Sequence, residues 1–156
     1  MEVASKSGYP YSALSNFSPH PFVFDGVECA SMEGLLQAFK FEKEHIQVEV
    51  CKLVGYAAKS RGSAHNSHWK RQQKLWWKGK AYDRDGKEYQ ELLDRAYDAL
   101  AENTSFQKAL LATGNAILRH SIGKSNPKDT VLTEREFCSR LMKLRIKIKA
   151  KDDKTK

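Results

Sequence analysis

Apolar residues recur at helical spacing through most of the chain and predict a mainly helical architecture. Ser31 precedes the strongly helical run 32–44, where its hydroxyl is suited to cap the first free amides. The same periodicity predicts further helices at 46–59, 89–100 and 104–111, because apolar residues three and four apart share one helix face. Helices therefore account for most of the predicted secondary structure.

The last helix and an N-terminal hairpin carry the clearest local signals. Thr133 and Glu136 have the spacing of a capping box, and one apolar stripe follows at Phe137, Leu141, Leu144 and Ile148. Asp25-Gly26 separates two short β-prone runs and predicts a type I′ hairpin. The polar, aromatic-rich stretch 61–86 is expected to run over the surface around one short helix at 69–77.

These elements predict a predominantly helical α+β fold with a single compact domain. A small N-terminal β-hairpin or sheet would pack against about five to six helices. The chain has 156 residues with 40% hydrophobic content, enough for one core and too few for two ordinary domains. We assign residues 1–148 to the domain and residues 149–156 to a basic C-terminal tail.

The charge is concentrated near the C-terminus. The formal net charge is +8, and seven bases against two acids in residues 143–156 supply most of it. Such a segment is usually a solvated helix end or an extension, and less often an arm that rests on phosphates. No apolar run is long enough to span a bilayer and the N-terminus lacks an apolar signal segment, so we expect a cytoplasmic protein without membrane partners.

The three cysteines, Cys29, Cys51 and Cys138, are widely spaced and odd in number. This pattern favours reduced thiols at or near the core over a disulfide framework or a zinc site. His65 and His68 have a spacing seen in metal sites, but no third ligand lies nearby in the sequence. We expect no metal and no cofactor.

Three polar residues of the predicted helix 32–44 share one face. At about 100° per residue, Glu33, Gln37 and Lys40 fall within a sector of roughly 60°, apart from the apolar residues of the same helix. A lysine side chain leans towards the helix N-terminus, so Lys40 and Glu33 can converge on one ligand. Any amphipathic surface helix shows the same separation of polar and apolar residues, so the spacing alone does not indicate an enzyme.

The motifs around this helix add a specific resemblance. They are LSNFSPHPF at 14–22, SMEGLLQAFKF at 31–41, Trp69, and LLATGNAILRH at 110–120. Together they resemble the NADAR family, also called YbiA-like, over nearly the whole chain up to the basic tail. In that family an S-N-F motif precedes a hairpin, a helix carries E-x-x-x-Q-x-x-K, and an L-L-A-T motif with a following histidine comes late.

The resemblance implies an N-glycosidase that acts on ribose-linked compounds. The implied substrates are ADP-ribose attached to guanine, in nucleic acid or nucleotides, and early intermediates of riboflavin biosynthesis. The family pattern assigns Glu33 and Lys40 to catalysis. It places in substrate binding, or leaves near the substrate, the residues Ser15, Asn16, Phe17, Gln37, Lys59, Arg61, Trp69 and His120.

The chemistry of these groups suits cleavage of a bond from ribose C1 to nitrogen. Positive charge develops at C1, so a carboxylate such as Glu33 can stabilise it or move the proton that the departing base needs. Lys40 can capture C1 as a Schiff base, or it can act only as a charge or a binding group. The Schiff-base role requires a neutral amine, and Glu33 beside it would oppose the necessary fall in the pKa of Lys40.

Ordinary structural roles compete with each binding assignment. Phe17 and Trp69 can stack on a base or sugar but also fit a core, and Ser15-Asn16 is common turn chemistry. His120 can contact phosphate or ribose or serve structurally, and the cationic Lys59 and Arg61 can meet a pyrophosphate or face solvent.

The segment 121–134 departs from the family pattern. Many members carry a W-G-x-G loop and N-x-L-G-x-x-L-M there, whereas this chain retains clearly only Leu141, Met142 and Arg145. The replacement leaves substrate choice open, with Glu134 or Lys124 as substitutes for lost contacts. Two rival hypotheses remain: a non-catalytic protein that binds or sequesters ADP-ribose or a related nucleotide, and a nucleic-acid binding module driven by the basic tail.

Overall fold

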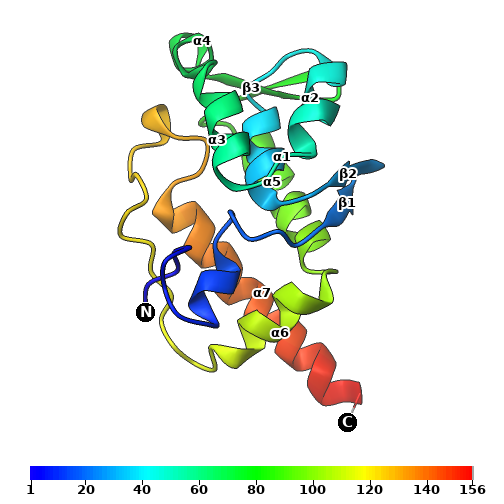
Figure 1. Cartoon of the computed structure of the whole chain (residues 1–156), viewed down its shortest axis with the longest axis vertical. Coiled ribbons are helices and arrows are strands. Elements are labelled where there is room, and N and C mark those ends of the chain that lie inside the picture. The colour runs from blue at the N-terminus through cyan, green and yellow to red at the C-terminus, as the bar shows by residue number, and fades with distance from the viewer. Residues whose placement is uncertain (156) are drawn as a thin grey trace.

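The computed structural model describes residues 1–155 as an α+β fold in which helices predominate (Figure 1). The predicted fold class is confirmed, with more helices than expected. In chain order the elements are η1 (Tyr11–Leu14), β1 (Phe22–Phe24), β2 (Val27–Cys29), α1 (Met32–Ala38), α2 (Glu44–Cys51), α3 (Gly55–Ser63), α4 (Asn66–Gln72), β3 (Lys74–Trp77), β4 (Lys80–Asp83), α5 (Lys87–Leu100), α6 (Thr104–Ala112), η2 (Pro127–Asp129) and α7 (Glu134–Thr155).

Two antiparallel hairpins supply the strands. The predicted hairpin is confirmed: β1 pairs with β2 across Asp25 and Gly26, whose φ values of 48° and 80° suit a type I′ turn. The short helix predicted at 69–77 is present but lies earlier in the chain, because α4 ends at Gln72 and residues 74–77 form strand β3. Positive φ at Lys78 and Gly79 turns this strand back into β4, and the side chains of Leu75, Trp76 and Trp77 are buried in the core rather than on the surface.

Helix α1 is shorter than predicted and ends before Lys40. Ser31 caps it as expected, accepting a hydrogen bond of 3.1 Å from the Gly34 amide. Beyond Ala38 the chain tightens into a turn, and the carbonyl of Phe39 accepts from the Trp76 amide of β3 at 2.8 Å. This contact to a neighbouring strand replaces the next intrahelical bond. Lys40 consequently lies in the turn after the helix that carries Glu33 and Gln37.

The predicted helix 46–59 is two helices in the structure. The chain breaks between α2 and α3, where Val54 is extended and Gly55 has a φ of +54°. The break lets the Leu53 carbonyl approach α1 so closely that a Cβ on Gly34 would lie 2.6 Å from its oxygen. Glycine at that position allows α1 to pack directly on the α2–α3 junction.

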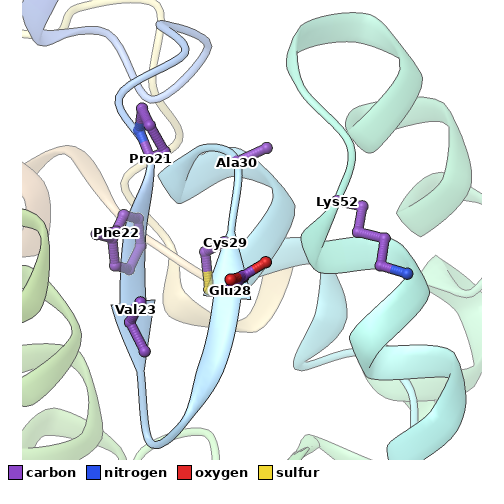
Figure 2. A pocket seen from close by; sticks show the side chains of 7 residues that line it. All are labelled: Pro21, Phe22, Val23, Glu28, Cys29, Ala30 and Lys52. Carbon is purple, nitrogen blue, oxygen red and sulfur yellow. The ribbon is translucent and has the colours of Figure 1, made fainter.

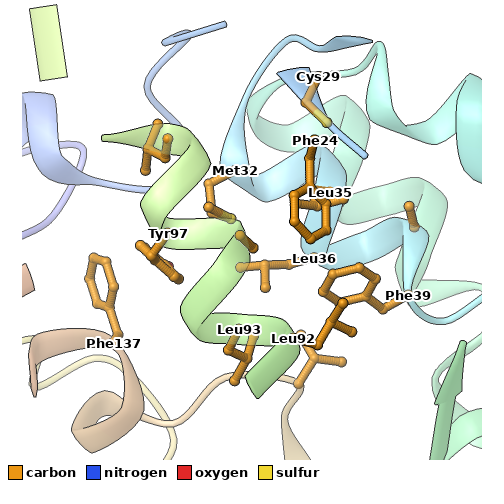
Figure 3. Packing of buried hydrophobic residues seen from close by; sticks show 14 of the residues in the cluster. Phe24, Cys29, Met32, Leu35, Leu36, Phe39, Leu92, Leu93, Tyr97 and Phe137 are labelled. Atoms are coloured by element: carbon orange, nitrogen blue, oxygen red, sulfur yellow. The ribbon is translucent and has the colours of Figure 1, made fainter. Parts of the chain in front are cut away.

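The core forms where α1 packs on α5, and α7 packs on the other side of α5 (Figure 3). Leu35, Leu36 and Phe39 of α1 point towards Leu92 and Leu93 of α5, and all five are at least 98% buried. Burial of each such side chain stabilises the fold by roughly 1.5–3 kcal/mol. Together these contacts fix the orientation of α1. The polar side of α1 is thereby directed away from α5.

Helix α7 begins as predicted and continues through the basic segment. Thr133 Oγ1 accepts from the Glu136 amide at 3.1 Å and Glu136 Oε1 accepts from the Thr133 amide at 2.8 Å, which confirms the capping box. The helix extends to Thr155, so most of the segment assigned to the tail is helical. The three cysteines are free and buried, as expected. Within residues 1–155, no helix is both long and apolar enough to cross a membrane.

Candidate active site

Glu33 and Gln37 form the helical half of the candidate site. They lie one turn apart on α1, and Gln37 Nε2 donates a hydrogen bond of 2.8 Å to Glu33 Oε1. Glu33 is half-buried at the start of the helix, and Gln37 is buried. The amide therefore fixes the direction of the carboxylate.

Gln37 itself is positioned by close packing against α3. A Cβ on Gly62 would lie 1.7 Å from Gln37 Oε1 and 2.6 Å from its Cδ, so only glycine leaves room for this amide. Gln37 Oε1 is buried and has no hydrogen-bond partner within the described structure. Close packing between α1 and α3 thus holds the Gln37 amide in place, while the amide nitrogen donates to Glu33.

Lys40 reaches the site from the turn after α1 and contacts α4. Its side chain is buried, and Nζ donates a hydrogen bond of 2.7 Å to Oδ1 of Asn66, the first residue of α4. The same oxygen accepts from Trp69 Nε1 at 3.3 Å. No ion pair joins Lys40 to Glu33 in the part of the chain that the structure describes, so the amine is held by a neutral acceptor.

Burial decides the electrostatics of both catalytic candidates. Desolvation lowers the pKa of Lys40 to about 8; the neighbouring charges of Lys70, Lys124 and Lys59 act in the same direction, and Glu33 opposes them. The pKa of Glu33 is raised, again chiefly by desolvation, against the hydrogen bond from Gln37 and the charges of Lys40, Lys59 and His120. The opposition expected between Glu33 and Lys40 is present, but burial outweighs it.

The S-N-F motif lies at the N-terminal end of α1. The Asn16 carbonyl accepts from the Glu33 amide at 3.0 Å, and Asn16 Oδ1 accepts from the hydroxyl of Tyr97 on α5 at 3.0 Å. Ser15 Oγ accepts from the Phe17 amide at 3.2 Å, as in a local turn. The motif therefore connects α5 to the first turn of α1, beside the carboxylate.

Phe17 and the cationic residues of α3 border the site on the side of that helix. Phe17 meets the exposed Tyr56 edge-on, with ring centroids 5.2 Å apart. Lys59 is exposed and close enough to Glu33 and Lys40 to influence both pKa values. Arg61 is also exposed, and its guanidinium lies 4.8 Å from the centroid of the Phe41 ring.

Trp69, His65 and His68 make packing contacts that stabilise the structure around α4. Trp69 is buried, and its indole anchors Asn66. His65 packs on Phe41 at 4.3 Å between ring centroids, and His68 stacks on a buried tryptophan. Among residues 1–155, no group of three or more His, Cys, Asp and Glu side chains is placed to hold a metal ion.

His120 and Lys124 of the divergent segment 121–134 are close enough to the candidate site to influence its pKa values. His120 Nδ1 lies 2.6 Å from the Val3 carbonyl, and the imidazole charge acts on Glu33. In Figure 1 the segment rises along the molecule towards α4, and Gln73 at the end of α4 donates to the Lys128 carbonyl at 3.0 Å. Lys124 is exposed and influences Lys40, whereas Glu134 pairs with Arg119 at 3.1 Å.

A buried ion pair anchors the end of this segment. Arg84 Nη1 and Nη2 donate to Glu136 at 3.1 and 2.7 Å, and Arg84 Nε donates to the Thr130 carbonyl at 2.8 Å. Burial alone would raise the pKa of Glu136, but hydrogen bonds from Arg84, the Thr133 amide and Gln90 lower it to about 2. The carboxylate thus stays ionised, and the segment that carries Lys124 is fixed to α7 at its end.

Two surface hollows lie outside this constellation. A hollow of about 460 Å³ beside the first hairpin is lined by Pro21, Phe22, Val23, Glu28, Cys29, Ala30 and Lys52 (Figure 2), none of which belongs to the predicted site. Another, of about 330 Å³, is lined by Ser5, Ser12, Ala13, Phe17, Ser18 and Pro19 and shares Phe17 with the site. Glu33 and Lys40 line neither hollow, and each influences the pKa of the other.

Comparison with known proteins supports the same assignment of family and fold. Residues 8–146 match the family described as bacteriophage protein GP30.3. The chain belongs to that family. This GP30.3 family member is 37% identical over 147 residues to an uncharacterized 17.1 kDa protein from the Gp30–rIII intergenic region of Enterobacteria phage T4, covering 93% of this chain and 96% of the relative.

The fold of this GP30.3 family member is also that of the E. coli protein YbiA. The NMR structure of YbiA aligns with a TM-score of 0.63 at 20% identity, covering 97% of this chain and 86% of that one. The YbiA-like fold predicted from the sequence motifs is confirmed.

Sequence reasoning missed the group that holds the Lys40 amine. Asn66 is separated from Lys40 by 26 residues, and their contact depends on how α4 packs against the turn after α1. Tyr97 lies in the helix predicted at 89–100, but its hydroxyl, which donates to Asn16 Oδ1, was not predicted to contribute to the site. No local sequence signal indicated Asn66, which lies before the helix predicted at 69–77.

Proposed function

We propose that this GP30.3 family member is a hydrolase that cleaves the N-glycosidic bond between ribose C1 and a nitrogen. The observation that carries the proposal is the buried Lys40 amine, whose pKa falls to about 8, near the polar pair Glu33 and Gln37. A pKa of about 8 leaves roughly a tenth of the amine neutral at pH 7, and the neutral form is the one in which a lysine acts as a nucleophile. Its substrates would be ADP-ribosylated guanine, in nucleic acid or nucleotides, or riboflavin-biosynthesis intermediates.

The reaction would proceed in two stages at C1: a covalent bond to Lys40 forms, and water then hydrolyses it. Neutral Lys40 Nζ forms a bond to C1 as the bond from C1 to the base nitrogen breaks, and the base leaves with the electron pair and takes up a proton. Loss of a proton from Nζ and opening of the sugar ring, with protonation of the ring oxygen, give a Schiff base. Water then adds to C1 to give a carbinolamine. Its hydroxyl loses a proton as the bond from C1 to Nζ breaks and Nζ takes up a proton, so the amine is regenerated and the sugar leaves as an open-chain aldehyde that recloses to the ring form with a C1 hydroxyl.

Glu33 would manage the proton and the developing charge. Burial raises its pKa, so this carboxyl can donate a proton to the departing base and accept one from the attacking water more readily than an exposed glutamate. As a carboxylate it also stabilises positive charge at C1. Gln37, through its 2.8 Å hydrogen bond, would keep the Glu33 oxygen directed at the sugar.

Borohydride trapping tests the covalent step. Purified protein is incubated with ADP-ribosylated guanine or with a riboflavin intermediate, reduced, digested and analysed by mass spectrometry. We expect the reduced sugar adduct on Lys40, no adduct in the Lys40→Ala variant, and turnover lowered by about 100-fold or more in Glu33→Gln. An unmodified Lys40 together with an active Lys40→Ala variant would overturn the Schiff-base mechanism.

The same substrates separate catalysis from binding alone. If the protein only binds or sequesters an ADP-ribosyl nucleotide, calorimetry will show saturable binding while the ligand is recovered intact after long incubation. Release of free base in proportion to time, abolished in Glu33→Gln, supports the hydrolase. The Glu33→Gln variant keeps the shape of the site, so its loss of turnover with retained binding distinguishes the two.

A further inference from the structure

The contact between Asn66 and Lys40 has a direct bearing on reactivity. We propose that Asn66 is a positioning residue that aims the Lys40 amine at C1 and, as a neutral acceptor, lets it react as a free amine. The inference rests on the proposed function, because it assigns a role within the same reaction. It adds a residue from α4 to a site otherwise built from α1, its following turn and their neighbours.

Two donors fix which atom of the Asn66 amide faces the lysine. Oδ1 is 2.7 Å from Lys40 Nζ and 3.3 Å from Trp69 Nε1. An indole nitrogen only donates, so the shared atom must be the amide oxygen, and its lone pairs serve both partners. Trp69 is 99% buried, so it holds the Asn66 amide in one orientation and thereby fixes the position of the amine.

The neutrality of Asn66 matters because of the charges around Lys40. Glu33 from α1 favours the ammonium, while Lys59 from α3, Lys70 from α4 and Lys124 from the segment 121–134 disfavour it. A second carboxylate at position 66, in direct contact with Nζ, would shift this balance towards the ammonium. An amide oxygen accepts a hydrogen bond from the neutral amine and leaves the nitrogen lone pair available for C1.

The decisive variant is Asn66→Asp, which replaces one amide with an isosteric carboxylate. Lysine labelled with ¹³C at Cε reports the titration of each amine by NMR, and the Lys40 signal is assigned by its loss in Lys40→Arg. We expect the midpoint to rise from about 8 by about one to three pH units in Asn66→Asp. The exposed Asn115→Asp adds the same charge elsewhere and should leave the midpoint unchanged.

Activity supplies the second readout. In Asn66→Asp the acidic limb of the kcat/KM profile should move to higher pH with the Lys40 midpoint, so activity recovers at alkaline pH. Asn66→Ser, whose shorter side chain cannot reach Nζ, should slow borohydride trapping at Lys40 by about 10- to 100-fold at every pH, because a misplaced nucleophile loses its alignment. A structural role alone would not move the pH limb.

Each outcome decides the inference. An unchanged Lys40 midpoint in folded Asn66→Asp overturns the inference. If Asn66→Asp does not fold, undiminished borohydride trapping at Lys40 in folded Asn66→Ser overturns it instead. A shifted midpoint in a protein that cleaves no substrate supports the Asn66–Lys40 coupling and counts against the proposed hydrolase. Turnover by the native protein with no shift of the Lys40 midpoint in Asn66→Asp supports the hydrolase and overturns the role of Asn66. Failure of the inference and failure of the proposed function are therefore distinguishable.

Discussion

At the scale of the residue, the candidate site contains a buried amine, that of Lys40, which is unfavourable for the stability of the fold. Lys40 is 94% buried and its pKa is lowered to about 8, so the folded state disfavours the ammonium that the unfolded chain carries at pH 7. A purely structural position would be filled more stably by an apolar side chain. Retention of a buried amine with one neutral partner therefore favours a chemical role over a structural one.

Lys40→Met should stabilise the protein while removing activity. Each unit of depressed pKa corresponds to about 1.4 kcal/mol, and after allowance for the lost Asn66 contact we expect the free energy of unfolding at pH 7 to rise by about 1 to 3 kcal/mol. The gain should shrink as pH rises from 8 to 10.5, where the native and then the unfolded chain lose the proton. Urea unfolding at several pH values measures it, and destabilisation at pH 7 would contradict the argument.

At the scale of the element, local sequence rules predicted two helix starts and one turn, whereas tertiary packing decided where α1 ends. The caps at Ser31 and Thr133 and the Asp25-Gly26 turn depend on neighbouring residues alone, and all three are confirmed. The end of α1 depends on β3, whose Trp76 amide bonds to the Phe39 carbonyl from far along the chain. Helical periodicity gave no sign of this distant strand.

The second hairpin was missed because its turn has a weak sequence signal. Lys78-Gly79 adopts positive φ without the Asn-Gly or Asp-Gly pair that usually announces such a turn. The candidate site was only half predictable, because part of it depends on contacts between segments far apart in the sequence. Glu33 and Gln37 share a helix face and were found by spacing, whereas Asn66 is brought to Lys40 by the packing of α4.

The packing of α3 on α1 can be tested at Gly62. In Gly62→Ala the added Cβ would lie 1.7 Å from Gln37 Oε1, so the amide must move and its hydrogen bond to Glu33 must break. We expect turnover to fall by about tenfold or more. Stability should fall by about 1 to 2 kcal/mol, as overpacking exceeds the better helix propensity of alanine.

A matched control for Gly62→Ala is Gly8→Ala, whose Cβ would meet no heavy atom within 4 Å. Steady-state kinetics and thermal unfolding of both variants separate a general effect of the added methyl group from the displacement of Gln37. Full activity in Gly62→Ala would show that the orientation of Glu33 does not depend on this contact.

At the scale of the whole molecule, the α4 side of the candidate site and the basic end of α7 lie at opposite ends. Figure 1 shows α4, which carries Asn66, at one end of the long axis and the end of α7 at the other. Four exposed lysines of α7 lie on one side of the helix at about 100° per residue, namely Lys143, Lys147, Lys151 and Lys154. Lys147 pairs with Asp98 of α5 at 3.2 Å, so the outer part of this row carries most of the available charge.

This separation predicts that the tail influences only large, anionic substrates. A variant that ends at Ile148 loses Lys149, Lys151, Lys154 and Lys156, while the Asp98 pair and the site remain. Turnover of a small ribosylated nucleoside should be unchanged. For an ADP-ribosylated oligonucleotide, KM should rise and its dependence on salt should weaken, since each lost phosphate contact removes roughly 0.7–0.9 from the logarithmic slope. Steady-state kinetics between low and physiological salt measures both, and equal loss of activity on the two substrates would instead assign the tail to the stability of the fold.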